Sequence, residues 1–301
     1  MVFKHLVLPG GGSNGIIDMG IIFYCLKNNI INMENIQSIH ATSVGSISAI
    51  LLCLASDYNE IETYIVNCMM DKCFYVDPDN IVNIMQAKGL INNDCFPKLL
   101  GPFFDANNID INITLKDFYN INKKELYFYA TRVKDVETVC FSHHDFPDLK
   151  LIDAIQGSCA LPGIITPTVY ENNIYIDGGV ITNYPIEECL LKENVEPNEV
   201  LGINHVFPPP ESCIDVNNFN IFGLMFYMLC CVVEKIIVLI TNNKYDNKIT
   251  EKKALTTQVN MYMDKYLLTF SELMEGFQSK DMRKQNIERG YEFARKHFEN
   301  A

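Results

Sequence analysis

KHLVLPGGGSNG, at residues 4–15, begins the part of the chain that decides the fold, and IHATSVGS, at residues 39–46, repeats its pattern. Each stretch is a short apolar run followed at once by small residues, as in a buried strand that ends in a tight turn. An apolar segment follows each turn, over residues 16–26 and 47–55, and each has the composition of a buried helix. The order strand, turn, helix, strand, turn, helix predicts a sheet with helices packed on its faces, which is an α/β fold.

The rest of the chain continues this pattern as far as the prolines at residues 208–210. Further strands are expected over residues 126–132, 136–141, 173–176 and 200–204, with a helix over residues 151–158. Three consecutive prolines interrupt both helices and strands, so they mark the best domain boundary. We therefore predict one domain over residues 1–207 and a helical C-terminal extension over residues 208–301.

The composition is that of a globular and acidic protein. Among 301 residues, 48% are hydrophobic and 20% are charged, which excludes disordered and low-complexity classes. The 37 Asp and Glu outnumber the 24 Lys and Arg, and the net charge of −13 argues against a nucleic-acid partner, which requires clustered basic residues. The same charge argues against membrane attachment through a polybasic patch.

The cysteines and the first residues indicate an intracellular, cytoplasmic protein. The 11 cysteines are scattered without a CxxC pair, so they are expected to be reduced thiols rather than a disulfide framework. Residues 1–9 contain Lys4 and His5 and lack the apolar segment of a signal peptide. The longest uncharged apolar stretch, residues 221–233, is too short to span a bilayer and is compatible with an interfacial helix or a core helix.

The glycine loop at residues 10–15 has two functional interpretations. Gly10, Gly12 and Gly15 match the dinucleotide-binding pattern G-x-G-x-x-G between a strand and a helix. That interpretation requires an acidic residue at the end of the next strand, and residues 40–43 contain none. In the second interpretation, the consecutive glycines Gly10, Gly11 and Gly12 let backbone N–H groups converge as an oxyanion hole for acyl transfer.

A candidate nucleophile follows the loop. Ser43 lies in a turn between a predicted strand and a predicted helix, where Ala41 and Gly45 occupy the two glycine positions of the nucleophile-elbow pattern G-x-S-x-G. Small residues are needed on both sides because strand and helix approach closely there. The turn predicts that the serine hydroxyl lies above the end of the sheet.

A serine hydroxyl needs a base, and the sequence has two candidates. Asp177 ends a predicted strand and is followed by Gly178 and Gly179, a context in which a carboxylate can face an open site. The order Ser43, Asp177, His205 also fits the Ser-Asp-His order of an α/β-hydrolase triad. His205 is therefore an alternative base.

In their order and spacing these motifs resemble those of the patatin-like phospholipase family. The resemblance covers residues 4–205 and includes residues 154–167, which look like the family's A-S-x-A-x-P-G block. It implies a three-layer α/β/α sandwich with a mostly parallel central sheet. It also implies that the glycine loop is the oxyanion hole, that Ser43 is the nucleophile, and that Asp177 is the base of a Ser-Asp dyad without a histidine.

The activity that the resemblance implies is that of a lipid acyl hydrolase of the phospholipase A type, a serine esterase without metal or cofactor. Its substrate would be a phospholipid or another acyl lipid, reached by peripheral contact with a membrane. Two residues depart from the family's pattern: Ala41 replaces a glycine, and Asn14 replaces an Arg or Lys. A catalytically weak or inactive lipid-binding protein on the same fold is therefore the alternative. The spacing of His, Cys, Asp and Glu shows no cluster of metal ligands.

Overall fold

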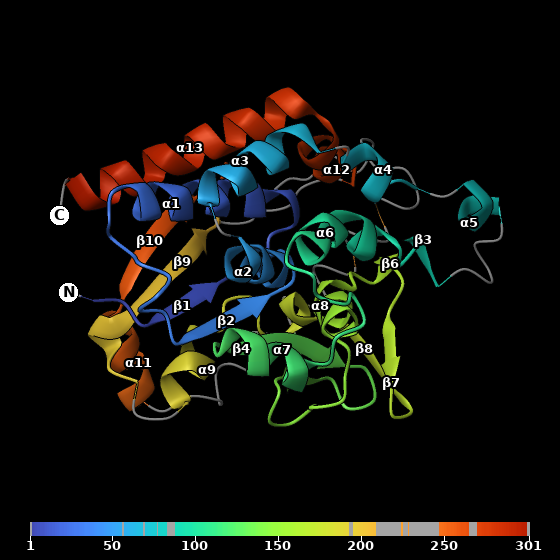
Figure 1. Cartoon of the computed structure of the whole chain (residues 1–301), viewed down its shortest axis with the longest axis horizontal. Helices are drawn as coiled ribbons and strands as arrows, with labels where there is room; N and C mark the ends of the chain where they lie inside the picture. Colours follow the sequence, from blue (N-terminus) through green and yellow to red (C-terminus); the bar gives the residue numbers. More distant parts are fainter. Residues whose placement is uncertain are drawn as a thin grey trace.

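The computed structural model of the chain has a central sheet with helices on both faces (Figure 1). It describes residues 2–55, 57–68, 70–76, 78–82, 88–192, 195–208, 224, 228, 247–264 and 270–299. The α/β/α sandwich expected from the sequence is confirmed in these residues.

Eight strands of the described residues form the central sheet, in the order β10-β9-β1-β2-β4-β8-β7, with β5 beside β4. Their bounds are β1 (His5–Leu8), β2 (Ser38–Thr42), β4 (Glu125–Arg132), β5 (Glu137–Phe141), β7 (Thr168–Tyr170), β8 (Asn173–Asp177), β9 (Val200–Val206) and β10 (Thr257–Tyr262). The strands from β10 to β4 are parallel to their neighbours, which confirms the prediction of a mostly parallel sheet. Strands β5, β8 and β7 are joined to it by antiparallel pairing. A separate parallel pair consists of β3 (Gly89–Ile91) and β6 (Gly163–Ile165).

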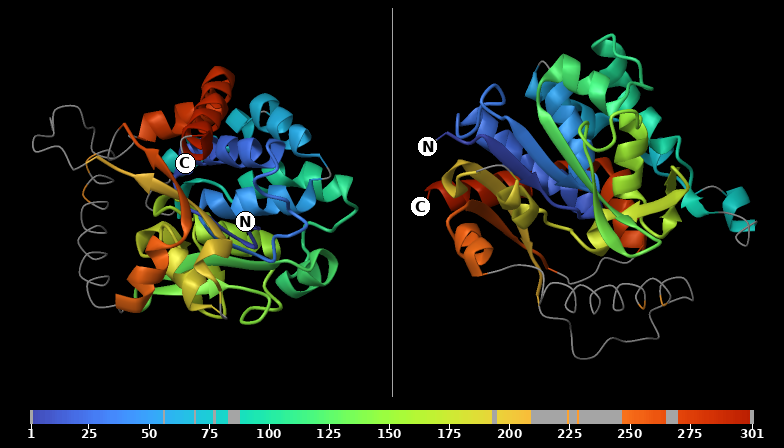
Figure 2. Two further views of the ribbon diagram at one scale, coloured as in Figure 1. Left: turned by 90° about the vertical axis from the view of Figure 1, so that its left-hand side faces the viewer. Right: turned by 90° about the horizontal axis from the view of Figure 1, so that it is seen from below.

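Helices cover the two faces of the sheet (Figure 2). One face carries α1 (Gly15–Lys27), α2 (Val44–Leu54), α3 (Tyr58–Asn67) and α13 (Lys280–Glu299), and the other carries α9 (Ile186–Leu191) with α11 (Asn247–Ala254) beside it. The remaining helices are α4 (Met70–Cys73), α5 (Pro78–Val82), α6 (Cys95–Ala106), α7 (Leu115–Asn122), α8 (Leu151–Cys159) and α12 (Phe270–Gln278).

Strand β1 contributes to the core on both faces. Leu6 and Leu8 belong to the large apolar cluster that includes α1 and α2, whereas Val7 packs with Ile186 and Leu190 of α9. Successive side chains of a strand point to opposite faces of its sheet. The short apolar run in the sequence is therefore buried from both sides.

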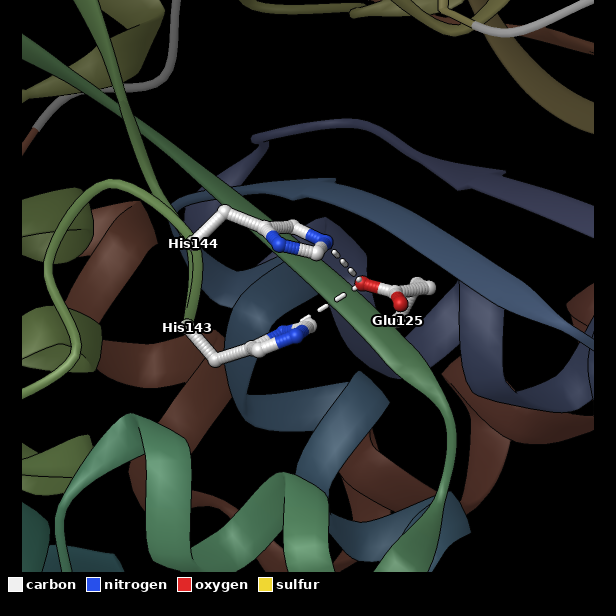
Figure 3. Close-up of side chains that lie close together, drawn as sticks. All are labelled: Glu125, His143 and His144. Carbon is white, nitrogen blue, oxygen red and sulfur yellow. Dashed lines mark hydrogen bonds and ion pairs between the residues drawn. The ribbon is translucent and has the colours of Figure 1, made fainter.

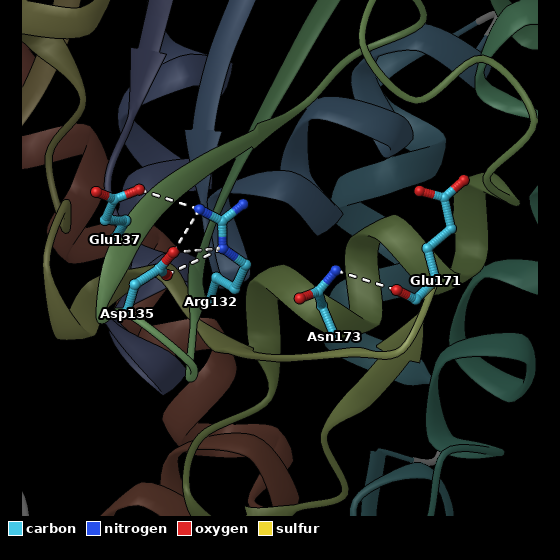
Figure 4. Close-up of polar contacts among 5 residues, drawn as sticks. All are labelled: Arg132, Asp135, Glu137, Glu171 and Asn173. Atoms are coloured by element: carbon cyan, nitrogen blue, oxygen red, sulfur yellow. Dashed lines mark hydrogen bonds and ion pairs between the residues drawn. The ribbon is translucent and has the colours of Figure 1, made fainter.

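Tight turns connect β4 to β5 and β7 to β8, and polar contacts within both turns are drawn in Figure 4. After β4, the Arg132 guanidinium donates hydrogen bonds of 2.9 Å and 2.7 Å to the carboxylate oxygens of Asp135. Between β7 and β8, both turn residues, Glu171 and Asn172, have positive φ, which is typical of the two-residue hairpin turn. The Asn173 side-chain amide donates to the carbonyl oxygen of Glu171 at 3.1 Å. The hairpin returns the chain along β8 to Asp177.

The C-terminal part of the chain contacts the body of the fold. β10 pairs with β9, and α13 lies along α1 (Figure 1). Gly20 of α1 and Gly290 of α13 meet where the helices cross, and a Cβ on Gly290 would lie 2.1 Å from the carbonyl oxygen of Ile17. Helices are present after residue 208, as expected, but strand β10 was not expected. The boundary between residues 207 and 208 stays a prediction.

The apolar stretch at residues 221–233 lies outside the described residues, apart from Leu224 and Met228. Its assignment as an interfacial or core helix therefore stays a prediction. In the part of the chain that the structure describes, no helix combines the length and the apolar character needed to cross a membrane.

Candidate active site

Ser43 occupies the sharp turn between β2 and α2. Its φ of 51° and ψ of −126° are unusual for a residue with a side chain, and such backbone strain is often found at functional sites. Gly45 permits the turn, because a Cβ there would lie 2.7 Å from the carbonyl oxygen of Leu8 and 2.9 Å from that of Pro9. The sharp turn predicted between strand and helix is present at Ser43, and its role as a nucleophile elbow stays a prediction.

Strand β4 brings Asp177 to Ser43. Tyr129 of β4 pairs with Thr42 of β2, and the next residue, Ala130, pairs with Asp177 of β8. Strand β8 therefore pairs with β4 just beyond the point where β2 ends. Ser43 follows Thr42, the last residue of β2, so it lies next to Asp177. The Ser43 hydroxyl donates a hydrogen bond of 2.6 Å to Oδ2 of Asp177.

The carboxylate of Asp177 is buried and held in one orientation. Asp177 is only 6% exposed to solvent. Its Oδ1 accepts a hydrogen bond of 2.7 Å from the backbone N–H of Gly179. A Cβ on Gly178 would lie 2.1 Å from the carbonyl oxygen of Tyr129, so this position accommodates only glycine. Burial raises the pKa of Asp177 to about 6, while the hydrogen bonds from Ser43 and Gly179 act in the opposite direction. At neutral pH the carboxylate is mostly ionised and can accept a proton from Ser43.

The strained turn is fixed by two further serines. The backbone N–H of Ser43 donates to Oγ of Ser158 at 2.9 Å, and the Ser158 hydroxyl donates to the carbonyl oxygen of Tyr129 at 2.7 Å. The Ser46 hydroxyl donates to the carbonyl oxygen of Ser43 at 2.5 Å. Both backbone polar groups of Ser43 are thereby satisfied in an otherwise unfavourable conformation.

The glycine loop lies against the Ser43 turn. A Cβ on Gly10 would lie 3.1 Å from Cβ of Ser43. The backbone N–H of Gly10 donates to the carbonyl oxygen of Asn183 at 2.9 Å, and the Asn183 side-chain amide donates back to the Gly10 carbonyl oxygen at 3.0 Å. Gly12 has a φ of 56°, which favours glycine. Within the described residues, no hydrogen bond occupies the backbone N–H of Gly11 or Gly12.

Two helix N-termini meet beside this loop. Gly15 is the first residue of α1 and Val44 is the first residue of α2, and a Cβ on Gly15 would lie 2.5 Å from Cγ2 of Val44. Each helix N-terminus carries a partial positive charge. The surroundings of Ser43 can therefore stabilise a developing negative charge.

His205 lies beside the same loop but contacts a different carboxylate. Its Nε2 is 2.8 Å from Oδ1 of Asp18 in α1, and both residues are buried. A Cβ on Gly11 would lie 2.6 Å from Cε1 of His205. Because His205 pairs with Asp18 and Asp177 contacts Ser43 directly, the structure does not contain the alternative arrangement of a histidine between Ser43 and Asp177.

A family model described as patatin-like phospholipase matches residues 6–190, a range that includes the glycine loop, the Ser43 turn and Asp177. The chain belongs to the patatin-like phospholipase family. The resemblance drawn from the motifs is confirmed at the level of the family.

Two curated viral proteins are similar to this patatin-like chain. A probable lipid hydrolase of Invertebrate iridescent virus 6 is 27% identical over 194 residues, which is 64% of this chain and 65% of that protein. An uncharacterized protein of Acanthamoeba polyphaga mimivirus is 27% identical over 183 residues, which is 61% of this chain and 60% of that protein. The chain thus spans less than two thirds of the length of these relatives.

Among solved structures, the chain is similar to VipD from Legionella pneumophila. The TM-score is 0.54 at 14% sequence identity, and the alignment covers 100% of this chain and 67% of that chain. This similarity supports a shared fold for the patatin-like chain.

Two residues that hold the site were assigned no role from the sequence. Ser158 lies in the block at residues 154–167, and Asn183 follows the Asp177 turn closely. Of the two departures from the family's pattern, Ala41 is fully buried in β2. The backbone N–H of Asn14 donates to the carbonyl oxygen of Gly11 at 3.1 Å, and the effect of its uncharged side chain on turnover stays a prediction.

Proposed function

We propose that the protein is a lipid acyl hydrolase of the phospholipase A type, in which Ser43 is the nucleophile and Asp177 is the general base. The observation that carries the proposal is the 2.6 Å hydrogen bond from the Ser43 hydroxyl to the buried carboxylate of Asp177. A serine is a poor nucleophile until an adjacent base accepts its proton. Asp177 is the group in direct contact with that proton.

In the first half of the reaction, Oγ of Ser43 attacks the ester carbonyl carbon while its proton passes to Asp177. The negative charge on the carbonyl oxygen is stabilised by the backbone N–H groups of Gly11 and Gly12 and by the N-termini of α1 and α2. When the tetrahedral intermediate collapses, Asp177 returns the proton to the leaving alcohol oxygen. The fatty acyl group is then bound to Ser43 as an ester.

In the second half, Asp177 accepts a proton from a water molecule that attacks the acyl group on Ser43. The second tetrahedral intermediate releases the fatty acid, and the proton returns to Oγ of Ser43. No step of this sequence requires a group other than those of the chain, the lipid and water.

The substrate class is proposed from the family and from one relative. The chain belongs to the patatin-like phospholipase family, and the iridescent virus protein is described as a probable lipid hydrolase. We propose a phospholipid or another acyl lipid, met at a membrane surface. The net charge of −13 favours apolar contact with that surface over electrostatic attraction.

The proposal is tested by separate replacement of the two central residues. Ser43→Ala removes the nucleophile and Asp177→Asn removes the base, so each is expected to lower the hydrolysis of phospholipid vesicles by at least about a thousandfold. Product fatty acids are measured by mass spectrometry, and circular dichroism checks that each variant is folded. The matched control is Ser48→Ala, one turn further along α2, whose hydroxyl contacts the carbonyl oxygen of Val44 and which is expected to retain activity.

A fluorophosphonate probe distinguishes the enzyme from an inactive lipid-binding protein on the same fold. The activated oxygen of Ser43 displaces fluoride and becomes covalently linked to phosphorus, which adds the mass of the probe less HF to one peptide. Labelling is expected in the natural chain and absent from Ser43→Ala. A folded natural chain that is not labelled would favour the lipid-binding alternative.

A further inference from the structure

The side chains of Glu125, His143 and His144 meet at the start of β4 (Figure 3). Glu125 is the first residue of β4, and His143 and His144 follow the end of β5. Because β4 and β5 are antiparallel, the start of one strand lies beside the end of the other. The topology therefore brings an adjacent histidine pair to a carboxylate.

Both imidazoles are directed at the same carboxylate oxygen. Oε2 of Glu125 is 3.3 Å from Nδ1 of His143 and 3.1 Å from Nε2 of His144. One ligand atom from each of the three residues lies within 4.8 Å of the other two. In a tetrahedral zinc site with bonds of about 2.0–2.1 Å, ligand atoms are about 3.3 Å apart. The two histidine-carboxylate distances already have that spacing.

One histidine of the cluster is packed against α7, whereas the other is open to solvent. The ring of Tyr119 in α7 stacks on that of His143, with centroids 3.7 Å apart and an angle of 5° between the planes. The side chains of His143 and Glu125 are 12% and 26% exposed, whereas that of His144 is 55% exposed. An ion at this point would be reached from solvent and could keep a water molecule as its fourth ligand.

Lys124, which precedes Glu125 in the sequence, forms its hydrogen bonds away from the cluster. Nζ of Lys124 donates hydrogen bonds to the carbonyl oxygens of Met33 and Ile36, at 2.5 Å and 3.0 Å. This contact directs the ammonium group of Lys124 away from the cluster. Imidazole nitrogens and carboxylate oxygens, the atoms of this cluster, are among the ligands that zinc prefers.

We propose that Glu125, His143 and His144 bind a zinc ion that joins the start of β4 to the segment after β5. Ala130, the partner of Asp177, follows Glu125 by five positions along β4, which corresponds to about 16 Å at about 3.3 Å per residue. The ion would thus stabilise the fold at the edge opposite the Ser43 turn and take no part in acyl transfer. It would be a second site, independent of the proposed hydrolase activity.

The test uses the full chain, stripped with a chelator and then titrated with Zn²⁺ or with Co²⁺ as a spectroscopic probe. Saturable binding of one ion is expected, with a visible Co²⁺ spectrum typical of nitrogen and oxygen ligands and a rise in melting temperature on adding Zn²⁺. The 11 cysteines are a competing class of ligand. Their participation would appear as a near-ultraviolet thiolate charge-transfer band, which contradicts the proposed site.

Variants assign the ion to the cluster. His144→Ala, at an exposed position, and Glu125→Gln are each expected to weaken Zn²⁺ binding by at least about tenfold, because the first removes a ligand and the second removes the negative charge of another. The matched control is Glu137→Gln, an exposed carboxylate at the other end of the same strand pair, which is expected to bind Zn²⁺ as the natural chain does. Unchanged binding in both cluster variants, or no saturable binding by the natural chain, would overturn the proposal. Ester hydrolysis is measured in parallel, and its presence or absence leaves this result unaffected.

Discussion

Asp177 combines burial with direct contact to the proposed nucleophile, and this combination predicts how hydrolysis depends on pH. Burial raises the pKa of its carboxyl group to about 6. Only the ionised carboxylate can accept the proton of Ser43. We therefore expect kcat/KM to rise about tenfold per pH unit below 6 and to level off above about pH 7.

The measurement uses a soluble ester, so that changes in a lipid surface do not contribute to the pH profile. Circular dichroism at each pH confirms that the chain stays folded across the range. A rate that stays constant from pH 5 to pH 8, or that falls as pH rises, would contradict the role of Asp177 as the base.

The central pair could be predicted from the sequence because each member lies in a short motif with its own backbone requirement. The small residues around a strand-to-helix turn indicate Ser43 as a candidate nucleophile. The two glycines that follow Asp177 indicate it as a candidate base. Ser158 and Asn183 act through hydrogen bonds to backbone atoms of Ser43 and Gly10. Such contacts depend on three-dimensional proximity and leave no pattern of spacing, so no role could be assigned to them from the sequence.

At the scale of elements, the strands predicted from apolar runs are present, whereas β3, β6, β7 and β10 were not predicted. The longest of these four, β10, has a weak signal in the sequence. In β10, Val259 and Met261 are buried while Asn260 and Tyr262 are exposed. Two buried residues in alternation are too few to distinguish an edge strand from a loop. The cluster of Glu125, His143 and His144 was missed for a similar reason, since the antiparallel pairing of β4 and β5 is what joins its members.

The crossing of α1 and α13 depends on the absence of a side chain at Gly290. A Cβ there would lie 2.1 Å from the backbone oxygen of Ile17 and 2.7 Å from Cα of Gly20. Gly290→Ala is therefore expected to separate the two helices and to lower the free energy of unfolding by about 1–3 kcal/mol, despite the better helix propensity of alanine.

Denaturant unfolding measures this change, and Gly101→Ala in α6 is the matched control. A Cβ on Gly101 would have no heavy atom within 4 Å, so that substitution is expected to be neutral or to raise stability by up to about 1 kcal/mol. Equal stability of the two variants would show that the close helix crossing is not required.

At the scale of the whole molecule, the first and last parts of the chain share one core. Ile17 and Ile21 of α1 belong to the same apolar cluster as Ile287 and Ala294 of α13. Arg283 of α13 is also buried, and its guanidinium donates hydrogen bonds to the carbonyl oxygens of residues 65, 66 and 68. The helix that directs its N-terminus toward the Ser43 turn is thus covered by residues from the far end of the chain.

This shared core predicts that a chain ending at residue 207 does not fold as an independent domain. Removing residues 208–301 exposes the edge of β9 that pairs with β10 and the apolar surface of α1 beneath α13. We expect the truncated chain to aggregate or to lack a cooperative thermal transition, and to lose fluorophosphonate labelling for that reason. A truncated chain that is monomeric, melts cooperatively and is still labelled at Ser43 would establish the boundary at residue 207 as that of a separate domain. Vesicle binding by the truncated chain is therefore informative only if that chain folds. The effect of residues 221–233 on lipid binding is better measured by polar substitutions within the full chain.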